Sequence, residues 1–246
     1  MAEALRIGWR QYRLERRMFW RNPSAAFFNF ALPLLFLALF GAIYAGDEQN
    51  IDVLLPGIAG MSIVSTTFVA LGHNLTFLRE QGILKRLRGT PMPTSSFLAA
   101  LAGHAVTNAV VQLLIVIVAG EVVFGIGWPR DWLALAVFAI AGVTCFALLG
   151  VALVHAIPNA DSAPAYVNLA FLPLIAISGV FYDADEAPAF LRDIAEALPL
   201  THLIDGLSGA MVTGASHWSD LIVIAIWTVG AAVLAVRGFS WEAKRN

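Results

Sequence analysis

The chain has 246 residues, of which 59% are hydrophobic and only 13% are charged, and its mean hydropathy is +0.76. Soluble domains contain about 45–50% apolar and 25% charged residues and keep a large exposed shell, so this composition excludes an ordinary soluble protein. The 15 Lys and Arg residues nearly balance the 17 Asp and Glu residues, which gives no reason to expect a nucleic-acid partner, and the single cysteine, Cys145, excludes an internal disulfide.

Residues 1–22 form an arginine-rich arm that ends at Pro23, a residue that suits the first turn of a following helix. If the arm is helical, four apolar side chains fall in one stripe. They are Leu5, Trp9, Tyr12 and Phe19. We therefore expect an amphipathic helix in the cytoplasmic membrane interface. A positively charged topology anchor is the alternative, and the two roles are compatible.

Six apolar stretches are long enough to cross a bilayer, which takes about 20 predominantly apolar residues. They are residues 25–45, 53–77, 97–124, 132–157, 165–182 and 218–236. The first is longer than the apolar region of a signal peptide, so we expect it to be retained. The sequence predicts an all-α integral membrane protein in which residues 1–246 form a single transmembrane domain.

The distribution of basic residues predicts the orientation, because cytoplasmic segments of membrane proteins carry an excess of Lys and Arg. Thirteen of the 15 basic residues lie in the arm, in the loop 79–93 and in the tail after residue 236. Only Arg130 and Arg192 fall on the opposite side, together with most of the acidic residues. We expect both termini to be cytoplasmic in the plasma (inner) membrane.

Polar side chains recur inside the second and third spans. They are Ser62, Ser65 and Thr66 in the second span, and His104, Asn108 and Gln112, spaced four residues apart, in the third. Polar groups in lipid must face protein or water. They are possible path-lining residues, but contact between helices, worth about 0.6 kcal/mol per hydrogen bond, is the commoner role.

The cytoplasmic loop 79–93 contains a short helical pattern over residues 80–88, which a Gly-Thr-Pro sequence ends. Ile83, Leu84 and Leu87 would share one face of this helix. An apolar face on a short charged helix favours a docking surface. Leucines that rest on the membrane are the alternative.

The external loop 183–217 contains an amphipathic segment, residues 189–198, between Pro188 and Pro199. The apolar continuation over residues 200–211 is too short to span and is expected to be re-entrant. From the residues alone, these short helices are interpreted as an interfacial loop.

Two motifs resemble those of ABC-2-type transporter permeases, the membrane subunits of ATP-binding-cassette exporters. The first comprises Glu80-Gln-Gly82, Lys85-Arg86-Leu87 and Thr90-Pro91, and the second comprises Ser178-Gly-Val-Phe181, Pro188, Leu198-Pro-Leu-Thr-His202 and Asp205. Members of that family often carry an arginine shortly after the position of Asp205, whereas Ser208, Gly209 and Ala210 occupy that region here.

The resemblance implies a coupling helix that docks on a separate ATPase, where Glu80 meets a basic residue and Gly82 permits close backbone approach. Its members would be Arg79, Glu80, Gly82, Ile83, Leu84, Lys85, Arg86, Leu87 and Arg88. The implied external gate residues are Phe181, Pro188, Pro199, His202 and Asp205. The implied partners are two ABC ATPase subunits, which would bind ATP and Mg, and a second or related permease. Drugs, lipids, glycolipids and polysaccharides are the implied substrates, and the apolar spans favour an amphipathic one.

The chain lacks the motifs of the enzymes that would offer another explanation. It has no G-x-x-x-x-G-K-[ST] sequence, so we expect no cofactor here and ATP must be bound by a partner. Neither H-E-x-x-H nor G-x-S-x-G occurs, and no metal site is expected. An intramembrane hydrolase and a self-contained channel are the alternatives to an exporter subunit.

Overall fold

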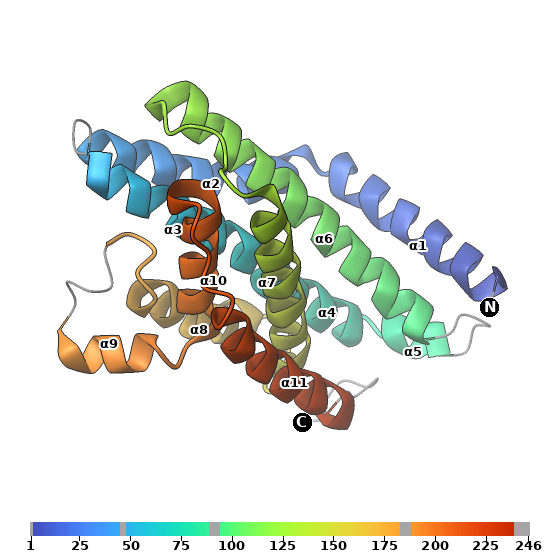
Figure 1. Ribbon diagram of the computed structural model, residues 1–246. Helices are drawn as coiled ribbons and strands as arrows, with labels where there is room; N and C mark the ends of the chain where they lie inside the picture. The colour runs from blue at the N-terminus through green and yellow to red at the C-terminus, as the bar shows by residue number, and fades with distance from the viewer. Residues whose placement is uncertain (1, 45–47, 89–93, 183–187, 239–246) are drawn as a thin grey trace.

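The computed structural model describes residues 2–44, 48–88, 94–182 and 188–238, and all the regular structure in these ranges is helical (Figure 1). The first half contains α1 (Ala2–Arg21), α2 (Pro23–Ile43), α3 (Glu48–Val64), the π-helical turn η1 (Ser65–Val69), α4 (Ala70–Glu80), α5 (Ile83–Arg88) and α6 (Thr94–Ala119). The second half contains the π-helical turn η2 (Gly120–Phe124), α7 (Trp132–Leu153), α8 (Ala163–Ile177), α9 (Ala189–Ala195), α10 (Pro199–Ser208), the π-helical turn η4 (Gly209–Thr213) and α11 (Asp220–Gly238).

Within the described residues, four helical stretches are long and apolar enough to cross a membrane. They are Ile51–Glu80, Ala99–Phe124, Trp132–Leu153 and Asp220–Arg237. These stretches match the second, third, fourth and sixth predicted spans. The first and fifth predicted spans overlap the shorter apolar segments Asn29–Ile43 of α2 and Ala163–Ile177 of α8, so the count of six spans stays a prediction.

The core is built around α3, which after Asp52 is almost entirely apolar and therefore suits a buried position. Its side chains from Leu54 to Val64 are buried, and α2, α6, α7 and α10 pack around it. Gly57 permits one of these close approaches, because an added Cβ would lie only 2.1 Å from the carbonyl oxygen of Val180. The buried helix thus fixes the positions of the surrounding elements.

The N-terminal arm is helical, as predicted, but it packs against protein. Helix α1 runs beside the N-terminal half of α6 (Figure 1). Gly8, Tyr12 and Glu15 lie on the face that meets α6, whereas Trp9 is 59% exposed and stacks on Tyr12. The predicted apolar stripe is therefore divided between the contact with α6 and the outer surface.

Helix α10 corresponds to the segment that we expected to be re-entrant, and it is one of the most deeply buried elements. Leu200, Leu203 and Leu207 are fully enclosed, and the helix contacts α3, α7 and α11. Gly142 on α7 and Gly206 on α10 sit where an added Cβ would meet Leu203 and Phe138 at under 3 Å. Short apolar helices can lie inside a membrane protein when other helices surround them in this way.

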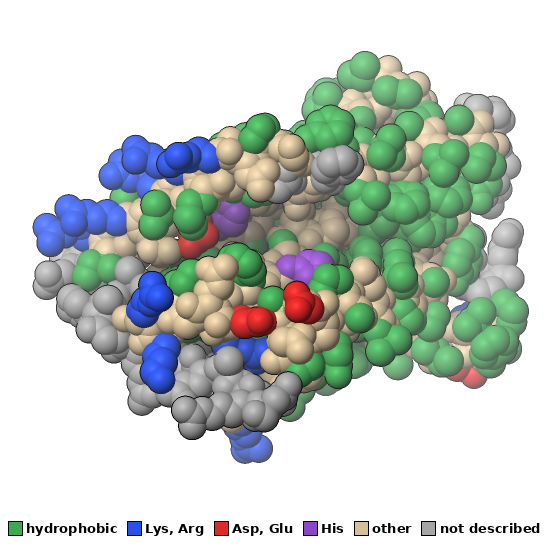
Figure 2. Space-filling model, turned by 180° about the vertical axis from the view of Figure 1, so that it is seen from behind, with side chains coloured by type: hydrophobic (Ala, Val, Ile, Leu, Met, Phe, Trp, Pro, Cys, Tyr) green, Lys and Arg blue, Asp and Glu red, His purple; other side chains and the backbone are tan. Residues whose placement is uncertain are grey.

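Basic side chains gather at one end of the molecule, where the start of α1 and α5 lie (Figures 1 and 2). Exposed members of this group are Arg10, Arg13, Arg17, Lys85 and Arg86. Hydrophobic side chains cover much of the remaining surface in the rear view (Figure 2). The fold therefore separates a basic end from an apolar body, as the charge count predicted.

Candidate functional site

The connection between α4 and α5 is a tight elbow that Gly82 makes possible. Gly82 has a φ of +68°, a left-handed conformation that residues with a Cβ rarely adopt. Its N–H donates to the carbonyl of Arg79 at 3.1 Å, and its own carbonyl accepts from Arg86 at 3.0 Å. An added Cβ would meet nothing within 4 Å, so the turn itself, within this chain, requires the glycine. Close approach of a partner backbone stays a prediction.

Arg79, at the start of this elbow, points into the protein. Its side chain is only 3% exposed, and its guanidinium donates to the carbonyls of Val154 at 2.8 Å and Ile157 at 2.5 Å. These carbonyls follow the last turn of α7, where helix carbonyls lack intrahelical partners. The arginine therefore caps α7. We expected it to be available for docking, but its side chain is buried.

Glu80, the next residue, also connects the end of α4 to the segment after α7. Its carboxylate accepts a hydrogen bond from the backbone N–H of Ala160, in the connection between α7 and α8. The end of α4 is therefore fixed to the end of α7 and to the segment that enters α8.

The side chains of the predicted coupling helix divide between interior and surface. Leu84 is 1% exposed and packs with Leu71, Leu75 and Phe97 in an apolar cluster separate from the core around α3. The expectation that its side chain forms part of a docking face is therefore wrong for this conformation. Ile83 is half-buried. The exposed residues are Glu80, Gln81, Lys85 and Arg86. The side chains of Leu87 and Arg88 lie outside the described residues, as do residues 89–93.

The hydroxyls of the polar residues in the second span donate to carbonyls of their own helix, and a path-lining role stays a prediction. The hydroxyls of Ser62 and Thr66 donate to the carbonyls of Ile58 and Ser62 at 2.7 Å, and both residues are buried. Ser65 donates to Ser62 in the same manner. Such back-bonding is typical of Ser and Thr in helices and accompanies local bending, here at the π-helical turn η1.

The polar stripe of α6 holds the N-terminal helices. Arg16 donates to Asn108 at 2.6 Å, and the Asn108 amide lies 3.2 Å from a ring nitrogen of His104. Gln112 donates to the carbonyl of Phe30 on α2 at 3.3 Å. These contacts match the helix–helix role that we considered the commoner one. Sequence reasoning missed Arg16 as the partner, although it interrupts the apolar stripe of the arm.

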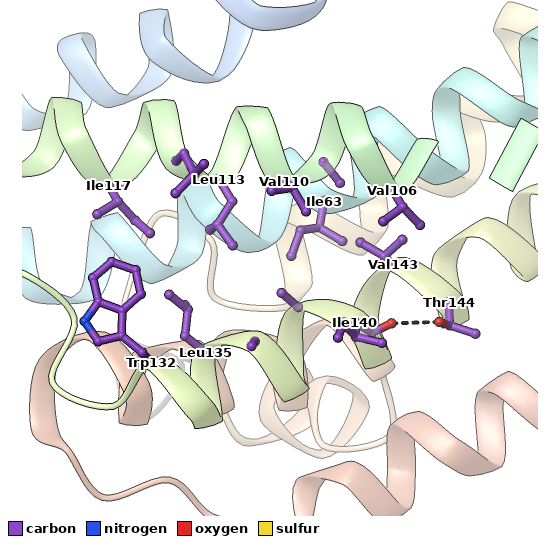
Figure 3. Close-up of a pocket in the computed structure, with 14 residues that line it drawn as sticks. Ile63, Val106, Val110, Leu113, Ile117, Trp132, Leu135, Ile140, Val143 and Thr144 are labelled. Carbon is purple, nitrogen blue, oxygen red and sulfur yellow. Dashed lines mark hydrogen bonds between the residues drawn. The ribbon is translucent and has the colours of Figure 1, made fainter. Parts of the chain in front are cut away.

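An apolar groove runs between α6 and α7 and encloses a volume of about 240 Å³ (Figure 3). Val106, Val110 and Leu113 of α6 face Leu135 and Val143 of α7 across it (Figure 3). The hydroxyl of Thr144 donates to the carbonyl of Ile140 and is thus satisfied within α7. The groove therefore offers hydrocarbon surface with almost no hydrogen-bonding capacity.

The predicted external gate residues have local structural roles. The ring of Phe181 stacks on Phe40 of α2 at a centroid distance of 4.6 Å, and its carbonyl accepts from Tyr44 at 3.3 Å. Pro188 precedes α9 and Pro199 begins α10, positions at which proline needs no N–H partner. Gating stays a prediction for these residues.

His202 joins α9, α10 and α11. Its Nδ1 lies 3.0 Å from a carboxylate oxygen of Asp220 at the start of α11, and its Nε2 lies 2.8 Å from the carbonyl oxygen of Glu196, directly after α9. Burial lowers the pKa of His202, but the hydrogen bonds to Asp220 and Glu196 and the charges of Asp220 and Asp205 raise it by more. The net result is a raised pKa, which favours the protonated ring.

A polar cavity of about 480 Å³ lies beside this histidine. Its lining includes Ser178, Arg192, Thr201, Asp205 and Asp220, from α8 to α11. Thr201 and Asp205 are four residues apart on α10 and so share one helical face. Sequence reasoning singled out His202 and Asp205 but missed Asp220, whose only signal was a carboxylate at the start of the last span.

Comparison with known proteins gives one family. The sequence matches the family model described as ABC-2 type transporter over residues 6–212. It is 26% identical over 218 residues to the daunorubicin resistance ABC transporter permease protein DrrB1 of Streptomyces coeruleorubidus, covering 83% of this chain and 74% of that protein.

Two further relatives match a smaller share of their own length. The probable multidrug ABC transporter permease YbhS of Escherichia coli K12 is 25% identical, covering 76% of this chain and 50% of that protein. The linearmycin resistance permease protein LnrN of Bacillus subtilis is 24% identical, covering 73% of this chain and 47% of that protein. This chain thus spans about half the length of these two relatives.

Proposed function

The chain belongs to the ABC-2 type transporter family, and from this membership we propose that it is the membrane permease subunit of an ATP-binding-cassette exporter. A permease of this kind forms the translocation path, and a separate pair of ATPase subunits binds ATP with Mg and supplies the energy. A second copy of this chain, or a related permease, completes the path.

The observation that carries the proposal is the attachment of the α4–α5 elbow to both neighbouring helices. Arg79 holds the end of α7, and Glu80 holds the connection into α8. In the proposed mechanism, ATP-driven closure of the ATPase subunits displaces α5, and the elbow transfers this displacement to α7 and α8. ATP binding drives the change only to the extent that it favours one arrangement of these helices over the other.

We further propose that the chain crosses the membrane six times with both termini in the cytoplasm. The basic end, which contains exposed Arg10, Arg13, Lys85 and Arg86, is then cytoplasmic, as the positive-inside tendency requires. Helix α1 lies at the cytoplasmic surface, where its exposed arginines meet anionic lipid headgroups. Helices α2 and α8 supply the first and fifth spans.

The proposed substrate is amphipathic. The apolar groove between α6 and α7 suits a hydrocarbon portion, and the polar cavity beside α10 suits a polar one. Two of the relatives carry names that refer to daunorubicin and linearmycin resistance, and a third is named for multidrug transport. These names support a substrate of the drug or lipid-like class.

The test is capture and activation of an ATPase. The purified chain in lipid nanodiscs is mixed with candidate ABC ATPase subunits from the same organism, and both copurification and ATP-dependent substrate uptake into inverted vesicles are measured. Lys85→Glu combined with Arg86→Glu reverses the charge of the two exposed basic residues of α5. This variant is expected to lose at least tenfold in ATPase capture and transport, because the reversed charges no longer complement a surface that binds the basic face of the wild type.

Arg130→Glu is the matched control, since Arg130 is an exposed basic residue outside the elbow. It is expected to capture the ATPase at the wild-type level. Wild-type capture and transport by the α5 variant would rule out docking through α5. Ion conductance without nucleotide would favour a channel, and turnover of a lipid or peptide by the chain alone would favour a hydrolase.

A further inference from the structure

The hydrogen bonds of His202 determine which of its ring nitrogens carries a hydrogen. Nε2 faces the carbonyl oxygen of Glu196 at 2.8 Å, and a carbonyl can only accept, so Nε2 must carry the hydrogen. Nδ1 faces a carboxylate oxygen of Asp220 at 3.0 Å. A carboxylate and an imidazole lone pair repel each other unless a cation lies between them. That cation is either a proton on Nδ1 or a metal ion.

The orientation of His202 is the one that metal-binding histidines usually have. Such a histidine presents one nitrogen to the metal and donates its other N–H to a carbonyl or a carboxylate, which fixes the ring. Here the Glu196 carbonyl fixes the ring and leaves Nδ1 directed at Asp220. The side chains of His202 and Asp220 are only 16% and 14% exposed, so most of their surface is removed from water.

A third ligand group completes the arrangement. One ligand atom each from His202, Asp205 and Asp220 lie within 4.8 Å of one another. Neighbouring ligands of a tetrahedral Zn²⁺ site lie about 3.4 Å apart, given bonds of about 2.0–2.2 Å. Closing the remaining difference requires the exposed Asp205 side chain to rotate away from its present interaction toward His202 and Asp220.

The adjoining cavity carries hydroxyls that have no hydrogen-bond partner among the described residues. They belong to Ser178, which is 1% exposed, and Thr201, which is 7% exposed. Both residues line the same cavity as Asp205 and Asp220. Buried hydroxyls without a partner are costly, and water bound to an ion is one group that would satisfy them. Arg192 opposes a cation here, but three carboxylates, those of Glu196, Asp205 and Asp220, line the cavity with it.

We propose that His202, Asp205 and Asp220 form a binding site for a divalent transition-metal ion of the Zn²⁺ type. One imidazole nitrogen and two carboxylates suit Zn²⁺ better than Mg²⁺ or Ca²⁺, which prefer oxygen ligands alone. The bound ion connects α10 to the start of α11, and His202 extends the connection to the end of α9 through the Glu196 carbonyl. The site thereby holds three external elements together.

Metal binding is measured directly on the full chain in nanodiscs, so the result does not depend on transport. Isothermal titration with ZnCl₂ is expected to show one saturable site per chain, and CoCl₂ is expected to give the visible absorption bands of Co²⁺ with nitrogen and oxygen ligands. Asp205→Asn removes one ligand and is expected to weaken Zn²⁺ binding at least tenfold. Because Asp205 takes no part in the bond between His202 and Asp220, this variant keeps that contact.

Two matched variants serve as controls. Asp193→Asn removes an exposed carboxylate of α9, and His217→Gln removes an imidazole that lines the same cavity. Both are expected to bind Zn²⁺ as the wild type does. Asp220→Asn removes a ligand and the salt bridge together, so its metal-free melting temperature is measured alongside its affinity.

Three results would overturn the assignment. The first is the absence of saturable binding at millimolar ZnCl₂. The second is equal Zn²⁺ affinity in Asp205→Asn and wild type. The third is binding of Mg²⁺, in a titration with MgCl₂, that is as tight as the binding of Zn²⁺. Either of the first two outcomes would leave the contact of His202 with Asp220 as a protonated salt bridge alone, and the third would show a cation site without preference for Zn²⁺.

Discussion

Gly82 shows how one residue type can satisfy two different requirements. Within the chain, its φ of +68° makes the turn between α4 and α5, and the space around its Cα is open. Toward a docked ATPase, the absence of a side chain would permit close backbone approach. These two requirements rank substitutions differently, so they can be separated.

Gly82→Ala is expected to destabilise the protein by about 1 kcal/mol, because alanine is strained in the left-handed region. Gly82→Asn is expected to cost less, since asparagine tolerates this conformation. Thermal unfolding in detergent should therefore give the highest melting temperature for the wild type, a lower one for Gly82→Asn and the lowest for Gly82→Ala. If the ATPase backbone also approaches residue 82 closely, ATPase activation will be highest for the wild type, lower for Gly82→Ala and lowest for Gly82→Asn, because asparagine is larger than alanine. Identical ranking in both assays would leave the turn as the only requirement.

Glu15 is a carboxyl at the contact between α1 and α6 and is 7% exposed. Burial raises its pKa above the usual value of 4.5, and the hydrogen bond from Gln11 at 2.8 Å lowers it only in part. Arg16, the next residue, is directed to Asn108. The folded state therefore binds the Glu15 proton more tightly than the unfolded chain does. The stability from this group is fully present below the unfolded pKa and is lost as pH rises through the folded pKa.

Glu15→Gln removes this loss, because glutamine is neutral at every pH and keeps the shape of the side chain. We expect the variant to be more stable than the wild type at pH 7.5 by about 1 kcal/mol, or about 2–4 °C in melting temperature for a chain of this length. The difference should vanish below pH 4.5, where the wild-type carboxyl is protonated in both states. A variant less stable than the wild type at pH 7.5 would contradict this account.

At the scale of elements, the π-helical turn η1 and α7 fit closely together. An added Cβ on Gly150 of α7 would lie 2.8 Å from the carbonyl oxygen of Phe68 in η1 and 3.0 Å from its Cα. Backbone atoms cannot rotate away as a flexible side chain can. The packing of these two elements therefore requires a residue without a side chain at this position.

Gly150→Ala is expected to destabilise the protein by about 1–3 kcal/mol, the usual cost of overpacking. Gly230→Ala is the matched control, because Gly230 lies in α11 and an added Cβ there meets nothing within 4 Å. The control should be neutral or more stable by up to about 1 kcal/mol, since alanine favours helix. Chemical unfolding in mixed micelles measures both. Equal effects of the two substitutions would disprove the close packing of η1 and α7.

The helices could be predicted from the sequence because apolar length and Pro or Gly positions are local properties. The hydrogen-bond partners of the polar residues could not be predicted, because the partners depend on which helices pack together. Arg79 belongs to a basic cytoplasmic loop by composition, yet its guanidinium caps α7, some 75 residues along the chain. Ser62 and Thr66 have the spacing of a polar stripe, but their hydroxyls are satisfied within their own helix.

The external segment illustrates the same division between local and long-range information. Residues 189–198 were predicted to form a short helix from amphipathicity and flanking prolines, and α9 confirms it. The polar cluster near α10 could be predicted only in part. His202 and Asp205 are close in sequence, whereas Asp220 reaches them because η4 and the following turn fold α11 back onto α10.

At the scale of the whole molecule, the proposed six-span topology depends on α8 crossing the membrane despite its 15 residues. If α8 crosses, Asp161 before it and Asp193 after it lie on opposite sides. If it does not, they lie on the same side. Both residues are exposed, and the native Cys145 is buried, so single introduced cysteines can be labelled over a low background.

We expect a membrane-impermeant maleimide to label Asp193→Cys in intact cells and to label Asp161→Cys and Arg86→Cys only after the membrane is opened. The reason is the positive-inside tendency, which places the basic α5 in the cytoplasm and, with five preceding crossings, α9 outside. Labelling of Asp161→Cys and Asp193→Cys from the same side would remove α8 from the spans. Labelling of Arg86→Cys in intact cells would do more, because α5 would then face away from any cytoplasmic ATPase and the proposed coupling would have no partner.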